Sequence, residues 1–166
     1  MQLLKGSTVV IKNGDLKFGF EEDSKLKMGI QNYSDLTLNN VRLSGGPTIQ
    51  YVLSNNYGDI HLQNHTEITP TNGNVAFDAW YGMSQVYDDP GVFVTLDNTV
   101  VVNGKVEFGK QQRASNANFA NHAGITVPSD YELEITPSSA ITDGSLEWVD
   151  NGNGTKTFKY VPADAS

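Results

Sequence analysis

A five-residue pattern, apolar–any–apolar–any–Asn, occurs four times in the first hundred residues of the chain. The copies end at Asn13, Asn40, Asn64 and Asn98, so the intervals between them are 27, 24 and 34 residues. Repetition at a period of roughly 20–50 residues is typical of solenoids. The pattern therefore predicts a stack of similar coils, in which any functional site lies on one face.

Each copy of the pattern is followed by two further short segments that favour strands. The second segments begin at Leu16, Val41, Thr66 and Val100, and the third segments cover residues 26–30, 48–52, 75–79 and 105–108. Apolar and charged residues alternate in the clearest of them, as in a strand with one buried face. Three short strands per repeat predict an all-β fold, a parallel β-helix of about four to five coils.

The recurring Asn is expected at a corner of each coil. A sharp bend often needs the left-handed backbone region, which Asn tolerates better than other non-glycine residues. Stacked Asn side chains also form hydrogen-bonded ladders along a column. We therefore predict a structural ladder of Asn13, Asn40, Asn64 and Asn98, although Asn is also common in ordinary turns.

The third interval is longer than the others, and the excess lies in residues 80–91. Insertions in a solenoid become loops on one face, which is often the binding face. Aromatic rings stack on the C–H faces of sugars, and carboxylates accept hydrogen bonds from sugar hydroxyls. The predicted glycan-binding residues are Trp80, Tyr81, Tyr87, Asp88 and Asp89, with packing of the loop onto the solenoid as the alternative.

Charge and composition exclude several classes of partner. The net charge is −8, whereas nucleic-acid binding requires clustered Lys and Arg, so no nucleic-acid partner is expected. An anionic membrane surface is disfavoured for the same reason, and no segment is long and apolar enough for membrane insertion. The chain has no Cys, so disulfides, thiolate metal sites and Cys nucleophiles are excluded.

Catalytic and metal-binding patterns are weak. Asp59, Asp78 and the adjacent Asp88–Asp89 pair are the acidic candidates, but no calcium-binding loop motif surrounds them. His61 and His65 lie on one segment without an evident third ligand, and His122 is far along the chain. We therefore expect no metal, no cofactor and no enzymatic activity. A polysaccharide-degrading enzyme remains an alternative, since glycosidases need only two suitably spaced carboxylates.

The C-terminal part departs from the repeat. Residues 110–123 are polar and predict a loop or one short helix, and residues 125–135 predict a last coil. Residues 146–161 read as a β-hairpin with a Gly/Asn turn, whose aromatics are expected to cover the open end of the solenoid. We predict a solenoid over residues 1–136 and a hairpin cap with a tail over residues 137–166, in one compact unit.

The run from Leu36 to Gly46 and the closing segment from Glu147 to Thr155 resemble right-handed β-helix surface proteins of gut Firmicutes and of phages that infect them. The resemblance covers about residues 6–160. It implies a right-handed helix and an extracellular place, on a cell surface or a virion. It further implies an adhesin-like module or a virion decoration or fibre subunit, with phage members often trimeric.

Three functions are consistent with these features. The first is a non-catalytic structural or adhesive module that binds a glycan or a host surface through residues 80–91. The second is a polysaccharide-degrading enzyme, which predicts carboxylates that converge in a groove along the sheets. The third is a subunit that self-assembles through an exposed apolar strip such as residues 100–102, where three consecutive Val place at least one side chain outward.

Overall fold

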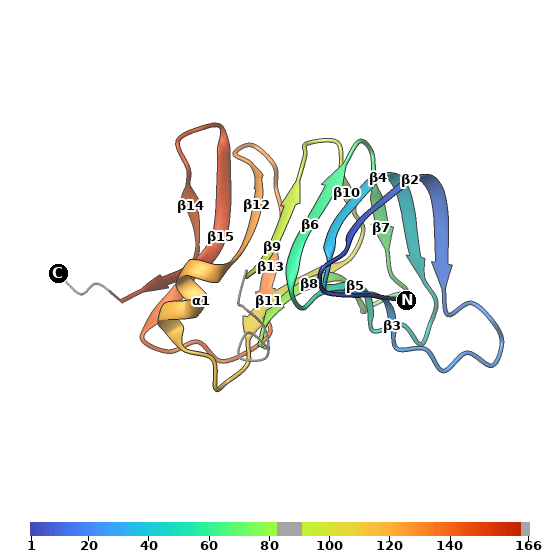
Figure 1. Cartoon of the computed structure of the whole chain (residues 1–166), viewed down its shortest axis with the longest axis horizontal. Helices are drawn as coiled ribbons and strands as arrows, with labels where there is room; N and C mark the ends of the chain where they lie inside the picture. Colours follow the sequence, from blue (N-terminus) through green and yellow to red (C-terminus); the bar gives the residue numbers. More distant parts are fainter. Residues whose placement is uncertain (83–90, 164–166) are drawn as a thin grey trace.

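The computed structural model is a parallel β-solenoid, described for residues 1–82 and 91–163 (Figure 1). Five strands, one from each coil, lie side by side in parallel, in the order β2 (Thr8–Phe18), β4 (Asp35–Gly45), β6 (Gly58–Gln63), β9 (Val92–Leu96) and β12 (Ala123–Pro128). The predicted fold class is confirmed. The coils run from β2 at the right of Figure 1 to a helix and a hairpin at the left.

Within the described residues the strands form two sheets that wrap a common core. Sheet A has six strands in the order β1 (Gln2–Leu3), β3 (Met28–Asn32), β5 (Tyr51–Asn55), β8 (Val75–Tyr81), β11 (Lys105–Lys110) and β13 (Ile135–Pro137). Sheet B has nine strands, namely β10 (Val101–Val102), β7 (Glu67–Thr69), β4 (Asp35–Gly45), β6 (Gly58–Gln63), β9 (Val92–Leu96), β12 (Ala123–Pro128), β15 (Thr155–Pro162), β14 (Gly144–Asp150) and β2 (Thr8–Phe18), which pairs with β4.

The repeated pattern stacks in register from coil to coil. Its first position forms one column of directly paired residues, and its third position forms a second column. These columns are Val9, Leu36, Ile60 and Val94, then Ile11, Leu38, Leu62 and Leu96. From the second coil onward both columns are buried, so the apolar positions of the pattern form the core because strand side chains alternate between the two faces.

The C-terminal end is closed by non-repetitive structure. Helix α1 (Asn116–His122) begins at Ser115, whose hydroxyl accepts a hydrogen bond from the Asn118 backbone N–H. The predicted hairpin is present as antiparallel β14 and β15, and β15 also pairs with β12. Phe119, Phe158 and Tyr160 are buried there, so aromatic side chains cover the last coil. No helix in the described ranges has the length and apolar character needed to cross a membrane.

Candidate functional site

The strongest candidate site is a groove of about 550 Å³ on the outer face of sheet A. Strands β3, β5, β8 and β11, which carry most of its residues, lie in the lower part of the solenoid in Figure 1. We call it the sheet A groove, and it is lined by Met28, Tyr51, Ser54, Asn56, Asp78, Trp80, Glu107, Pro137 and Ser138. These residues come from five successive coils, so the groove exists only once the coils stack.

Two carboxylates lie at the centre of the sheet A groove. Asp78 on β8 is paired directly with Ser54 on β5 and with Glu107 on β11. These three side chains point outward because they occupy the strand positions between inward-facing core residues. The Ser54 hydroxyl donates a hydrogen bond of 2.5 Å to the Asp78 carboxylate, whose residue is only 6% exposed. The register thus holds two acids side by side.

The electrostatics of the groove bring the titration of Asp78 into the neutral pH range. Burial raises the pKa of Asp78 to about 7, the hydrogen bond from Ser54 opposes that change, and the neighbouring Glu107 charge adds to it. The Tyr51 hydroxyl donates a hydrogen bond of 3.3 Å to the Glu107 carboxylate. Burial, followed by the charges of Glu107 and Asp78, raises the pKa of Tyr51. The groove therefore brings one hydroxyl and two carboxyl groups together.

Two aromatic residues stand on either side of the acid pair. Tyr51 reaches across β8 to Glu107, while Trp80 lies two residues beyond Asp78 on the same outer face. The Tyr51 hydroxyl contacts the Glu107 carboxylate and Trp80 lines the same groove, so a ligand bound at the acid pair also meets aromatic surface.

One polar atom of the groove has no partner in the described structure. The Ser138 hydroxyl oxygen is buried and makes no hydrogen bond with any described residue. Ser138 lines the groove directly after β13, where its hydroxyl lies over Gly109, two residues beyond Glu107 on β11. Because a buried hydroxyl is costly when it is left unpaired, a polar ligand or a water molecule is the natural partner here.

The prediction for Tyr81 is wrong, whereas Trp80 lies in the groove. Strand β8 continues through Tyr81, two residues beyond the predicted strand end, and alternation turns Trp80 outward and Tyr81 inward. Tyr81 is 1% exposed, with its ring 6.0 Å from Phe119 and 6.5 Å from His122. Tyr81 therefore packs the core and does not face a ligand. The predicted residues Tyr87, Asp88 and Asp89 lie outside the described residues.

His61 lies beside two acidic side chains. His61 Nε2 lies 3.2 Å from the Asp35 carboxylate, and Asp59 joins them so that one ligand atom of each lies within 4.8 Å of the others. Burial raises the pKa of Asp59, against the effect of His61. The strand register brings these three side chains together, because His61 on β6 pairs with Thr37 on β4, two residues from Asp35. Asp35 is exposed and Asp59 and His61 are partly exposed, so these three side chains form a polar surface cluster.

Of the four signature Asn residues, Asn13 and Asn40 lie inside the long strands β2 and β4, Asn64 directly follows β6, and Asn98 lies two residues after β9. Asn13, Asn40 and Asn64 have left-handed backbones, with φ of 59°, 56° and 50°. Asn40 donates its amide to Asn13 at 3.0 Å, and Asn64 donates to Asn39 at 3.0 Å. Asn98 is not left-handed; at its corner, Asp97 accepts hydrogen bonds from the backbone N–H groups of Asn64 and Thr99.

A second pair of Asn residues lies inside the solenoid and was not predicted from the sequence. Asn32 and Asn55 are paired in register, are both 0% exposed, and share a hydrogen bond of 3.0 Å from Asn32 Nδ2 to Asn55 Oδ1. Asn55 also donates to the carbonyl oxygens of Gly58 and Phe93. The available signal was an Asn at the end of two successive third strands, which apolar periodicity does not detect.

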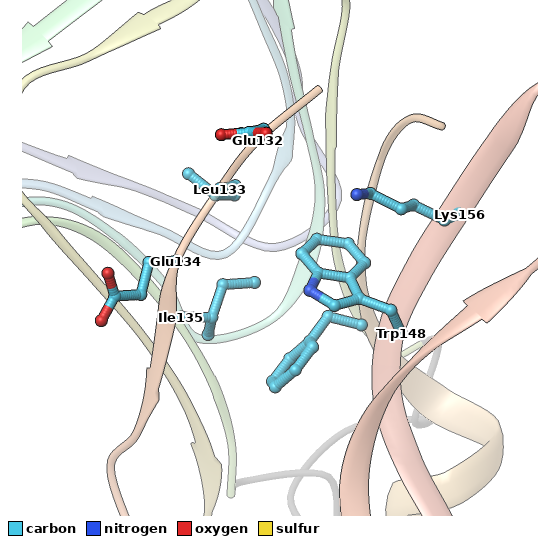
Figure 2. A pocket seen from close by; sticks show the side chains of 7 residues that line it. Glu132, Leu133, Glu134, Ile135, Trp148 and Lys156 are labelled. Atoms are coloured by element: carbon cyan, nitrogen blue, oxygen red, sulfur yellow. The ribbon is translucent and has the colours of Figure 1, made fainter. Parts of the chain in front are cut away.

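A cleft of about 620 Å³ lies between the segment before β13 and the terminal hairpin (Figure 2). Figure 2 shows Leu133 and Ile135 on one wall and Trp148 on the other, with Lys156 above the indole. The Lys156 ammonium is 4.7 Å from the Trp148 ring centroid, and Phe158 meets that ring edge-on at 5.2 Å. Trp148 therefore packs against Lys156 and Phe158 of β15 and stabilises the terminal hairpin.

Comparison with protein-family models, with curated proteins and with solved structures found no match for this chain. The functional interpretation therefore depends on the geometry of the sheet A groove. Of its central residues, Asp78 and Trp80 were singled out in the sequence. Glu107 and Ser138 were missed because each belongs to a different coil, and no local motif links them.

Proposed function

We propose that this protein is a glycan-binding module whose ligand lies in the sheet A groove. The observation that carries the proposal is the combination of Tyr51 and Trp80 with the acid pair Asp78 and Glu107 on one outward face. Aromatic faces accept the C–H side of a sugar ring, and acids and hydroxyls bind its hydroxyl groups. A net charge of −8 favours a neutral or cationic glycan over an acidic one.

Such a module would act on the outside of a cell or particle, as an adhesive or structural element. The stacked sheets present a rigid, extended surface, and rigid elements position binding side chains better than loops do. The resemblance to surface proteins of gut Firmicutes and their phages points in the same direction. Of the segment 80–91 that was predicted to bind a glycan, Trp80 belongs to this proposed site, because it lies on β8 and lines the groove.

The test is retention on a glycan array by the intact chain and by variants with one aromatic residue removed. Trp80→Ala and Tyr51→Ala are expected to lower the signal for the same glycans at least tenfold, because stacking surface is lost from both ends of the groove. Trp148→Ala is the matched control, since it removes the other Trp of the chain from the end cleft. Circular dichroism establishes that each variant is folded.

The proposal fails if the intact chain binds no glycan. It also fails if Trp148→Ala removes binding while folded Trp80→Ala and Tyr51→Ala retain it, which would assign the ligand to the end cleft. A folded Glu107→Gln variant provides a third test that leaves both rings in place, and unchanged binding by that variant would exclude the acid pair from recognition.

Hydrolysis of a glycan in the same groove is a second candidate. The observation that favours it is the raised pKa of Asp78, about 7, beside a second carboxylate. A neutral acid that donates a proton and a charged acid that serves as base or nucleophile are what glycoside hydrolysis requires. Reducing sugar released by the intact chain, and lost in both Asp78→Asn and Glu107→Gln, would establish this activity. Binding without release would leave the groove as a recognition site only.

A further inference from the structure

The two ends of the solenoid differ in how their cores are covered. At the C-terminal end, α1 and β15 bury the last coil. At the N-terminal end, Val9, Ile11 and Leu16 are only partly buried, whereas the residues paired with them on β4, namely Leu36, Leu38 and Leu43, are all 0% exposed. The first coil is therefore built from core residues that lack an outer layer.

Exposed apolar side chains gather at the same end. Six large apolar residues in the described ranges are strongly exposed, and five of them belong to the first 26 residues: Met1, Leu4, Val10, Phe20 and Leu26. Clustered apolar exposure marks interaction sites, whereas single exposed residues are ordinary. Only Val101 lies elsewhere, so the self-assembly strip that was predicted at residues 100–102 has the weaker support.

The outer edge of β2 is an eleven-residue template for another strand. One edge of β2 pairs with β4 along Thr8–Phe18, and the other edge has no strand beside it in the described structure. Long unpaired edges invite pairing with another chain. Figure 1 shows β2 as the outermost strand of sheet B at this end of the molecule.

The burial pattern of β2 is symmetric around the bond between Asn13 and Gly14: residues at equal distances before and after this bond are buried to the same degree. Val9 and Ile11 face inward before this corner, and Leu16 and Phe18 face inward after it. The left-handed backbone of Asn13 bends the strand there. A two-fold axis through the corner therefore places the first arm of one β2 on the second arm of another, with inward residues facing inward residues.

Charges match in the same register. Antiparallel pairing about the corner sets Ile11 opposite Leu16 and sets the exposed Lys12 opposite the exposed Asp15 of the second copy. The first 27 residues hold five of the eleven basic residues and only four of the nineteen acidic ones. Two copies of this strongly acidic chain can therefore approach through this end without the repulsion that other faces would cause.

We propose that the N-terminal end of the solenoid is a dimerisation surface, on which the free edge of β2 pairs antiparallel with β2 of a second copy about the Asn13–Gly14 corner. The partner is a second copy because the pattern is complementary to itself. The opposite end of another copy does not offer a matching surface, since α1 and the hairpin cover its core. This inference is independent of glycan binding.

Sedimentation velocity between 1 and 100 µM is the first test, on the full chain of 18.1 kDa. The expected result is a reversible change to a species of twice that mass. A chain that stays monomeric at 100 µM, a trimer, or an open series of larger species would each overturn the proposal, since a two-fold pairing of one edge closes at two copies.

Charge reversal tests the register. Lys12→Asp sets like charges opposite each other at both symmetry-related positions and is expected to raise the dissociation constant about tenfold or more. The double variant Lys12→Asp/Asp15→Lys restores opposite charges and is expected to recover most of the affinity. Lys105→Asp makes the same charge change on sheet A and serves as the control, with no expected effect. Failure of the double variant to recover affinity would refute the register.

A single cysteine tests the symmetry axis, because the chain has none of its own. Gly14 has an ordinary φ, and an added Cβ would meet only the Lys12 carbonyl oxygen at 4.0 Å, so Gly14→Cys fits the fold. We expect Gly14→Cys to form a disulfide-linked dimer on mild oxidation and Val101→Cys to remain uncrosslinked. The reverse result would move the interface to β10 and contradict the proposal.

Discussion

At the scale of single residues, Asp78 carries an energetic cost that depends on pH. Its pKa is about 7 in the folded chain and 3.8 as a free side chain, so the folded state holds the proton more tightly. The contribution of Asp78 to the free energy of unfolding is therefore fully present below about pH 4 and is lost as the pH rises through 7. A buried Asp78 carboxylate thus lowers the stability of the protein above about pH 7, and shifted pKa values of this kind are common at functional sites.

Asp78→Asn should remove this dependence. Asn stays neutral and still accepts the hydrogen bond from Ser54, so the variant is expected to be more stable than the parent at pH 8, by an amount on the order of 4 kcal/mol at most. The two chains should be similar at pH 4. Urea unfolding at both pH values measures the effect, and an equal difference at the two values would contradict the raised pKa.

The interior and exterior Asn residues should differ sharply in their contribution to stability. Asn55→Ala removes three hydrogen bonds inside the protein and is expected to cost about 2–4 kcal/mol. Asn40→Gly keeps the left-handed backbone and loses one exposed hydrogen bond, so it should cost less than about 1 kcal/mol. Thermal unfolding compares them, and equal costs would show that the exposed ladder matters as much as the buried pair.

At the scale of elements, the strands were predictable and the groove was not. The repeated five-residue pattern predicted which strands stack, since Val9, Leu36, Ile60 and Val94 pair in the expected register. The coils differ in length at their turns, however, so sequence spacing does not reveal that Ser54, Asp78 and Glu107 share one row. The end of β8 was also misplaced, because the aromatic residues at 80 and 81 resemble a loop when tertiary packing is unknown.

The terminal hairpin should behave as a cap for the core. Phe158 on β15 packs against Phe108 of the last full coil and against Trp148 of β14, with ring centroids 5.9 and 5.2 Å apart. Phe158→Ala is therefore expected to cost about 3–5 kcal/mol of stability and to increase binding of a hydrophobic dye. Val101→Ala changes an exposed strand residue and should have little effect. A small loss in Phe158→Ala would mean that the hairpin does not close the solenoid.

At the scale of the whole molecule, protection against hydrogen exchange should be graded along the solenoid. Repeat proteins are stabilised by contacts between neighbours, so an end coil with one neighbour opens most easily. In the Lys12→Asp variant, diluted below its dissociation constant, we expect β2 amides to exchange faster than those of β4, β6 and β9, whose core residues are buried. Mass spectrometry of exchange measures this order, and uniform protection would contradict an uncovered first coil.

The central claim is that a glycan lies against Trp80 in the sheet A groove, and tryptophan fluorescence tests it most directly. The chain has two Trp residues, so Trp148→Phe leaves Trp80 as the single reporter and Trp80→Phe leaves Trp148. Titration with an oligosaccharide retained on the array should shift the emission of the Trp148→Phe chain and leave that of the Trp80→Phe chain unchanged. A shift confined to the Trp80→Phe chain, or saturable binding that moves neither emission, would contradict the account.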